Sequence, residues 1–166
     1  MRNMQRREVF SSFASRFKKT DTSIVRPPYC DQIELFNQKC PACIDKPCVN
    51  ACNEKIIFID KEGLAALVFD QNGCTYCEKC ALTCMGAVLS LTCKDMRIQA
   101  TFSISTQKCL AWQSVMCSSC LDACNERAIQ FFGVFRPIIK KESCTNCGMC
   151  VSVCPSDALE IKGARQ

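Results

Sequence analysis

The chain has 166 residues, among them 18 cysteines and no histidine, and its formal charge is +5. This length allows one domain or two small ones. The lack of histidine excludes His-ligated zinc sites and the commonest general base, and so many cysteines indicate a scaffold built on disulfides or on metal.

The N-terminal segment, Met1 to Lys19, is basic and contains no apolar run of the length that a secretory signal needs. Arg6-Arg7 can mark export of a folded protein, but Arg16, Lys18 and Lys19 interrupt the place where an apolar segment should follow. No stretch reaches the length of a membrane span. We therefore expect a cytoplasmic protein, whose reduced cysteines bind metal instead of forming disulfides.

Phe10, Phe13 and Phe17 recur at helical spacing, which predicts an amphipathic basic helix over Met4 to Lys18. A solvated tail, a contact with a partner protein and a contact with a membrane surface all remain open for it. Arg26-Pro27-Pro28-Tyr29 then reads as an extended linker because of its prolines. Residues 1–29 are thus predicted to form a tail and a linker.

Sixteen cysteines fall into four runs, and the second and fourth runs have the spacing C-x2-C-x2-C-x3-C of bacterial ferredoxins. Pro155, which follows the fourth run, completes that pattern. We predict that all sixteen bind iron, in four [4Fe–4S] clusters. The runs are Cys40, Cys43, Cys48 and Cys52; Cys74, Cys77, Cys80 and Cys84; Cys109, Cys117, Cys120 and Cys124; and Cys144, Cys147, Cys150 and Cys154.

The spacing within a run has a physical reason. Three cysteines two residues apart lie on one loop that covers a face of a cubic cluster, and the N–H groups of the loop point at the sulfides. We expect the fourth cysteine, three residues on, at the start of a helix that faces away from the loop. In two-cluster ferredoxins this cysteine binds the other cluster.

Two other scaffolds fit the cysteines less well. Structural zinc usually takes two C-x2-C pairs about 15–20 residues apart, and a disulfide-rich fold needs export. The cluster hypothesis also changes the net charge. An oxidised cluster with four thiolates carries about −2, so four clusters bring the whole protein to about −3 and remove the main argument for nucleic-acid binding.

The runs repeat in pairs. The first and third runs end alike, at Ala51 to Glu54 and at Ala123 to Glu126, whereas the second and fourth begin alike with Cys-Thr. This order predicts a duplicated two-cluster module, with residues 30–95 as the first copy and 96–166 as the second.

The duplication predicts how ligands are shared, because the fourth cysteine of each run crosses to the other run of its module. In the first module the predicted sets are Cys40, Cys43, Cys48 and Cys84, and Cys74, Cys77, Cys80 and Cys52. In the second they are Cys109, Cys117, Cys120 and Cys154, and Cys144, Cys147, Cys150 and Cys124. A pairing of the outer runs with each other and of the inner runs with each other is left open by the near-equal spacing.

Short strands and helices are expected between the runs. Two hairpins are predicted around Gly63 and Gly133, one strand from alternation between Ile98 and Ile104, and short helices after the runs. The predicted ranges are Ile56 to Ile59, Ala65 to Phe69, Ile129 to Phe132, Val134 to Ile139, Cys80 to Met85 and Cys150 to Ala158. The fold class is therefore α+β, as tandem two-[4Fe–4S] ferredoxin-like modules. Each module of about 70 residues is too small for an apolar core alone, so clusters are expected to form its centre.

The remaining features indicate no catalysis. Cys30 and Cys93 lie outside the runs and are interpreted as ordinary thiols, and Trp112 is expected to shield a cluster from water. Acidic residues beside cysteines, such as Glu54 and Asp157, are interpreted as helix-start and surface residues. No nucleotide motif or Gly-rich phosphate loop is present, so we expect no enzyme and no catalytic residues.

The third run, with its long gap between Cys109 and Cys117, resembles a known family. The segment from Cys109 to Cys120, C-L-A-W-Q-S-V-M-C-S-S-C, together with Arg6-Arg7 and Arg26-Pro27-Pro28-Tyr29, is similar to the NapF family of ferredoxin-type proteins from periplasmic nitrate reductase systems. The similarity runs along nearly the whole chain. The first run departs from the usual spacing by two extra residues around Lys46.

The resemblance implies a cytoplasmic, monomeric accessory protein. Its partner would be the precursor of the catalytic molybdenum subunit, before export, and its role would be loading or redox adjustment of that subunit's own cluster. Two alternatives remain: an electron-transfer subunit of a membrane or soluble redox complex, and a metal scaffold without a redox role.

Overall fold

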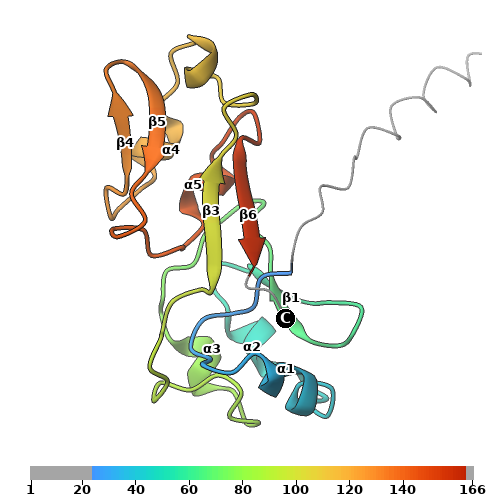
Figure 1. Ribbon diagram of the computed structural model, residues 1–166. Coiled ribbons are helices and arrows are strands. Elements are labelled where there is room, and N and C mark those ends of the chain that lie inside the picture. The colour runs from blue at the N-terminus through green and yellow to red at the C-terminus, as the bar shows by residue number, and fades with distance from the viewer. Residues whose placement is uncertain (1–23, 164–166) are drawn as a thin grey trace, which may run out of the picture.

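The computed structural model describes residues 24–163 and combines short helices with three two-stranded antiparallel sheets (Figure 1). The predicted helix Met4 to Lys18 lies outside the described residues. The mixed helix and strand content agrees with the predicted α+β class. The elements are α1 (Glu34–Lys39), α2 (Pro47–Ala51), β1 (Ile57–Ile59), β2 (Ala65–Leu67), α3 (Lys79–Leu82), β3 (Ala100–Ile104), the 3-10 helix η2 (Ala111–Gln113), α4 (Ser119–Asp122), β4 (Ile129–Phe132), β5 (Phe135–Ile139), α5 (Met149–Ser152) and β6 (Leu159–Gly163).

Both predicted hairpins are confirmed, with strands slightly shorter than expected. Strand β1 pairs with β2 so that Ile57 lies opposite Leu67, and β4 pairs with β5 so that Ile129 lies opposite Ile139. Gly133, between β4 and β5, has a φ of +67°, which is why glycine suits that turn.

The third sheet joins the segment before the third run to the segment after the fourth. Strand β3 pairs with β6, with Ala100 opposite Gly163 and Ile104 opposite Leu159. The predicted alternation holds, since Ile98 and Phe102 are buried. Strand β6 was not predicted from the sequence. In the first half of the chain, the segment before the first run and the segment after the second run are joined by a backbone hydrogen bond instead of a sheet. The N–H of Ser90 donates to the carbonyl of Tyr29 over 2.8 Å.

The helices beside the runs are shorter than predicted. Helix α3 ends at Leu82 instead of Met85, and α5 ends at Ser152 instead of Ala158. The expected place of the fourth cysteine at a helix start is also wrong, because each helix ends before that cysteine. The third residue after it has a positive φ, which does not continue a helix. These residues are Lys55 (φ 55°), Ala87 (50°), Arg127 (49°) and Asp157 (49°).

The larger apolar core lies in the first half and extends into the second. Phe36, Leu64 and Ile98 are among its most buried side chains, and Phe102 of β3 also belongs to it. Residues 25–30 are buried against this core, so the interpretation of Arg26 to Tyr29 as an extended linker is wrong. No helix between residues 24 and 163 has the length and apolar character needed to cross a membrane.

A buried ion pair ties residues 25–30 to the turn between β1 and β2. Arg26 Nη1 donates to Asp60 Oδ2 over 2.6 Å, and both side chains are 6% exposed. Asp60 Oδ1 accepts the N–H groups of Glu62 and Leu64, each over 2.9 Å. Burial opposes ionisation of Asp60, but these hydrogen bonds and Arg26 together hold its pKa below the usual value. The carboxylate therefore closes the hairpin turn and neutralises a buried guanidinium.

Replacing Asp60 by Ala should destabilise the protein strongly, because it leaves Arg26 buried without its partner. We expect the free energy of unfolding to fall by about 3–5 kcal/mol. Chemical denaturation of the anaerobic protein measures the change. The matched control is Asp70→Ala, an exposed aspartate in the same region, which should shift it by no more than about 0.5 kcal/mol. Equal effects of the two substitutions would contradict the assignment.

Candidate iron–sulfur cluster sites

Three cavities are each lined by four cysteines. Each set combines the first three cysteines of one run with the fourth cysteine of the neighbouring run, in the combination that crossing within a module predicts. The sets are Cys52, Cys74, Cys77 and Cys80; Cys109, Cys117, Cys120 and Cys154; and Cys124, Cys144, Cys147 and Cys150. We call them the second, third and fourth sites.

The remaining four cysteines of the runs also lie together, and we call them the first site. Burial raises the pKa of the Cys48 thiol, and its neighbours Cys84, Cys40 and Cys43 raise it further. Burial likewise raises the pKa of Cys40, and Cys84 and Cys43 act in the same direction. Cys84 therefore stands beside the first run although it belongs to the second.

Four short helices position the third cysteine of every run in the same way. That cysteine is the second residue of its helix each time, and α2 packs against α3 while α4 packs against α5. These cysteines are Cys48 in α2, Cys80 in α3, Cys120 in α4 and Cys150 in α5. Each fourth cysteine follows the end of a helix and so reaches the neighbouring site.

The enlarged loop of the first run keeps this arrangement. The Lys46 ammonium donates to the carbonyl of Cys40 and, over 2.8 Å, to that of Gly63, which fastens the loop to the β1–β2 turn. Pro47 then begins α2, a favourable position for proline because it needs no hydrogen-bond donor there. Cys48 thereby occupies the same helical position as its three counterparts.

Backbone N–H groups point at several of the sulfur atoms. Leu89 donates to Cys84 Sγ over 3.4 Å, Ala128 to Cys124 Sγ over 3.2 Å, and Ala158 to Cys154 Sγ over 3.3 Å. Each donor lies one or two residues after the residue of positive φ that follows the fourth cysteine. The turn at that residue therefore directs the N–H toward the sulfur. Such hydrogen bonds are among the features that set cluster potentials.

The thiol groups gathered in each site favour the binding of cations when they ionise. Burial raises the pKa of Cys80 and Cys150 to about 12, and neighbouring thiols of their own sets raise it further. Burial also raises the pKa of Cys74 and Cys120 to about 11. Four thiolates that line one cavity repel one another unless metal ions lie between them. The all-thiolate donor sets therefore fit iron–sulfur clusters, which are held by four cysteines.

Among residues 24–163, no group of three or more Cys, Asp or Glu side chains is spaced to hold one metal ion.

The two cysteines outside the runs contact other groups. Cys30 Sγ donates to the carbonyl of Gln32 over 3.1 Å, and Cys93 Sγ to that of Asp95 over 3.5 Å. Neither lines the cavities of the second, third and fourth sites. Trp112 packs against the small core around Cys109, and its Nε1 donates to the carbonyl of Pro137 over 3.1 Å. Trp112 does not itself line the cavity of the third site, so its shielding role stays a prediction.

Sequence analysis missed the residues that join the second run to the fourth, among them Gly73, Tyr76 and Gly148. The available signal was the glycines beside ligand positions, since Gly73 directly precedes Cys74 and Gly148 directly follows Cys147.

Comparisons with known proteins agree with the geometry. A family model described as a 4Fe-4S dicluster domain matches residues 115–158, which include most of the third run and all of the fourth. Ferredoxin-type protein NapF of Escherichia coli K12 is 32% identical over 149 residues, 87% of each chain. NapF of Haemophilus influenzae is 29% identical over 146 residues, 86% of this chain and 81% of the relative. A ferredoxin of Methanothermococcus thermolithotrophicus is 37% identical over 46 residues, 28% of this chain and 77% of the relative. No solved structure matches.

Removal of iron should unfold most of the chain. Helices α2 to α5 have only four or five residues each, too few to persist in water without packing, and each contains a cysteine of a site. We expect the circular dichroism of the iron-free, reduced protein to lose most of its helix and strand signal. A native-like spectrum after complete iron removal would show that the apolar cores suffice.

Proposed function

Because the chain belongs to the NapF family of ferredoxin-type proteins, we propose that it carries four [4Fe–4S] clusters and serves as an accessory iron–sulfur protein of a periplasmic nitrate reductase system. The observation that carries this proposal is the similarity to NapF over 87% of the chain. When bound, the clusters supply one-electron redox chemistry. The protein itself supplies thiolates, N–H groups and a dry surrounding, and we propose no catalytic residue.

The cluster count and ligand sets follow the crossing arrangement. Three cavities with four cysteines each, and the gathering of Cys84 with the first run, support four sets of four. A dicluster family model that matches most of the third run together with all of the fourth supports pairing within a module instead of pairing between outer and inner runs. We therefore propose two duplicated two-cluster modules, over residues 30–95 and 96–166.

Ligand substitutions distinguish these pairings. The intact protein should contain about sixteen irons, and each Cys→Ser change at a site should disturb one cluster. Cys52→Ser should disturb the same cluster as Cys77→Ser, and a different one from Cys43→Ser, as judged by electron paramagnetic resonance of the reduced protein. Cys30→Ser and Cys93→Ser are the controls and should leave iron and spectra unchanged. A Cys52→Ser spectrum that matches Cys43→Ser would contradict the crossing.

We further propose that the protein acts in the cytoplasm on the precursor of the catalytic molybdenum subunit. It would load or adjust the redox state of that subunit's own cluster before export. The alternative, a permanent electron-transfer subunit of a redox complex, predicts a stable stoichiometric complex that is reduced by a physiological donor.

The maturation role predicts two results in the native host. The tagged protein should retain the precursor on purification, and deletion of its gene should lower nitrate reductase activity. Restoring the gene with Cys93→Ser should recover that activity, whereas Cys43→Ser at the first site should not. Normal activity in the deletion strain, without retention of the precursor, would reject this role.

A further inference from the structure

The second and fourth runs lie directly against each other, although 70 residues separate their first cysteines in the chain. The N–H of Cys74 donates to the carbonyl of Cys147 over 2.6 Å. A ligand position of the second site therefore adjoins a ligand position of the fourth.

Two glycines make this approach possible. A Cβ on Gly73 would overlap the backbone N of Met149 and would lie only 2.8 Å from the Cys147 carbonyl oxygen. Gly148 has a φ of +82°, and a Cβ there would overlap the ring of Phe69. Phe69 in turn contacts Phe102 edge to face, with ring centroids 6.0 Å apart. Backbone therefore meets backbone and ring at this junction, with no room for a side chain.

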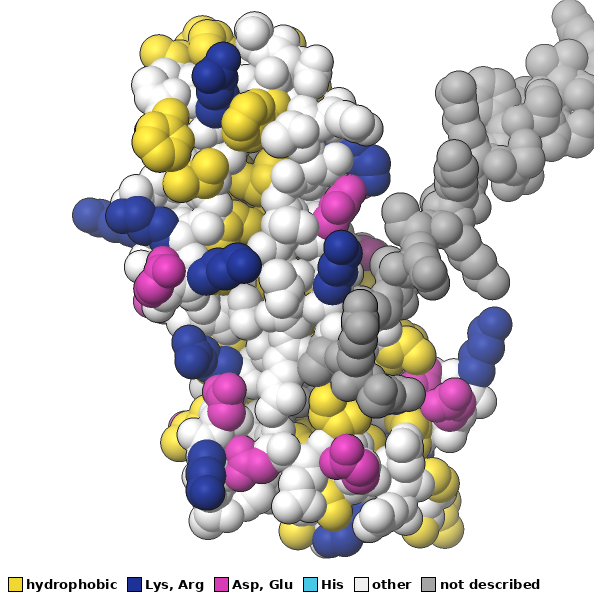
Figure 2. All heavy atoms as spheres, viewed as in Figure 1, with side chains coloured by type: hydrophobic (Ala, Val, Ile, Leu, Met, Phe, Trp, Pro, Cys, Tyr) yellow, Lys and Arg dark blue, Asp and Glu magenta, His cyan; other side chains and the backbone are white. Residues whose placement is uncertain are grey.

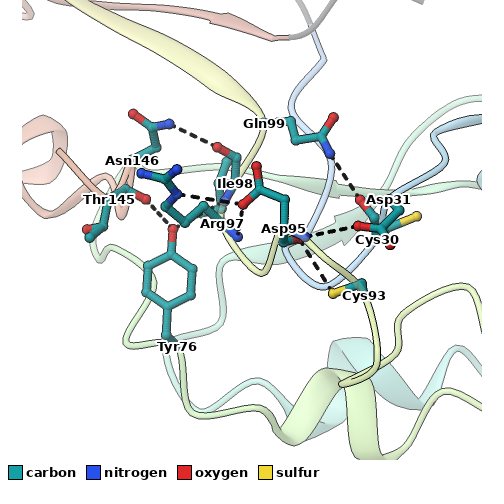
Figure 3. Close-up of polar contacts among 10 residues, drawn as sticks. All are labelled: Cys30, Asp31, Tyr76, Cys93, Asp95, Arg97, Ile98, Gln99, Thr145 and Asn146. Carbon is teal, nitrogen blue, oxygen red and sulfur yellow. Dashed lines mark hydrogen bonds and ion pairs between the residues drawn. The ribbon is translucent and has the colours of Figure 1, made fainter. Parts of the chain in front are cut away.

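Tyr76, in the second run, helps to hold the second and fourth runs in a fixed relative position (Figure 3). Its hydroxyl donates to the carbonyl of Thr145 in the fourth run and accepts the N–H of Ile98 over 3.2 Å. Asn146 Nδ2 donates to the carbonyl of the same Ile98 over 3.0 Å. The loops of the two runs and the segment before β3 thus share one hydrogen-bonded network.

We infer that the four sites form one row in the order first, second, fourth, third, with Gly73, Gly148 and Tyr76 as positioning residues at its middle. This inference rests on the proposed four clusters. Helices α2 and α3, which carry cysteines of the first and second sites, pack together, and so do α4 and α5, which carry cysteines of the third and fourth sites. The contact between Cys74 and Cys147 places the second site beside the fourth. The row therefore differs from the order of the runs in the sequence.

The order predicts different roles in electron transfer for the end sites and the middle sites. Since electron tunnelling weakens steeply with distance, an electron from a one-electron reductant enters at one end of the row and leaves to a one-electron oxidant at the other. Exposed apolar side chains mark both ends. Ile44 and Met85 follow ligand positions of the first site, and Met116 precedes one of the third. Hydrophobic side chains also gather over β4 and β5, beside the third site, at the top of Figure 2.

Magnetic interaction between reduced clusters tests the order. In fully reduced protein, the second and fourth clusters should broaden each other's electron paramagnetic resonance signals. Gly73→Ala and Gly148→Ala should separate the two runs and remove this broadening while about sixteen irons remain. Tyr76→Phe, which removes only a hydroxyl, should weaken it. The matched control is Gly86→Ala, because a Cβ there meets no atom closer than 3.8 Å.

If the glycine variants lose iron, substitutions of the cysteine ligands test the order of the sites independently. Cys147→Ser at the fourth site should sharpen the signal of the second cluster, and Cys117→Ser at the third should not. The inference is overturned if Cys117→Ser has that effect instead, or if all junction variants keep both iron and broadening. An iron content far below sixteen in the unsubstituted protein would reject the four-cluster proposal itself.

Discussion

The crossing of the fourth cysteine between neighbouring runs is the constraint on which the rest of the structure depends. Cys52 lines a cavity with the second run, and Cys154 lines one with the third. A run therefore cannot complete its own donor set, and both runs of a pair must fold together. Helices α2 and α3, and α4 and α5, pack as pairs for the same reason. We therefore expect metal binding and folding to be one process in this chain.

The same constraint explains why the helices are short and the turns unusual. A helix that continued past Ala51 or Ser152 would carry the fourth cysteine away from the neighbouring site. The chain turns instead at a residue of positive φ, at Lys55 and Asp157 among others, although that conformation costs non-glycine residues about 1 kcal/mol or more. The turn leads into N–H groups that reach the sulfur atoms, and we expect binding of the proposed clusters to offset its cost.

Much of this arrangement can be predicted from the sequence, because ligand spacing and hairpin signals are local. The grouping of Cys84 with the first run and the hairpin around Gly133 follow from them. The ends of α3 and α5 do not, since Ala87 carries no signal of a positive φ and Asp157 carries only a weak one. The junction between Cys74 and Cys147 was also missed. It depends on a meeting of distant loops, and only the missing side chains of Gly73 and Gly148 hint at it.

The most direct test of the crossing ligand sets is diffraction from an anaerobically grown crystal, with an anomalous map at the iron edge. Four compact groups of iron atoms are predicted, one in each set, with Cys52 and Cys84 each bound to the group of the neighbouring run. Single metal atoms, fewer groups, or runs that bind with their own four cysteines would contradict the account.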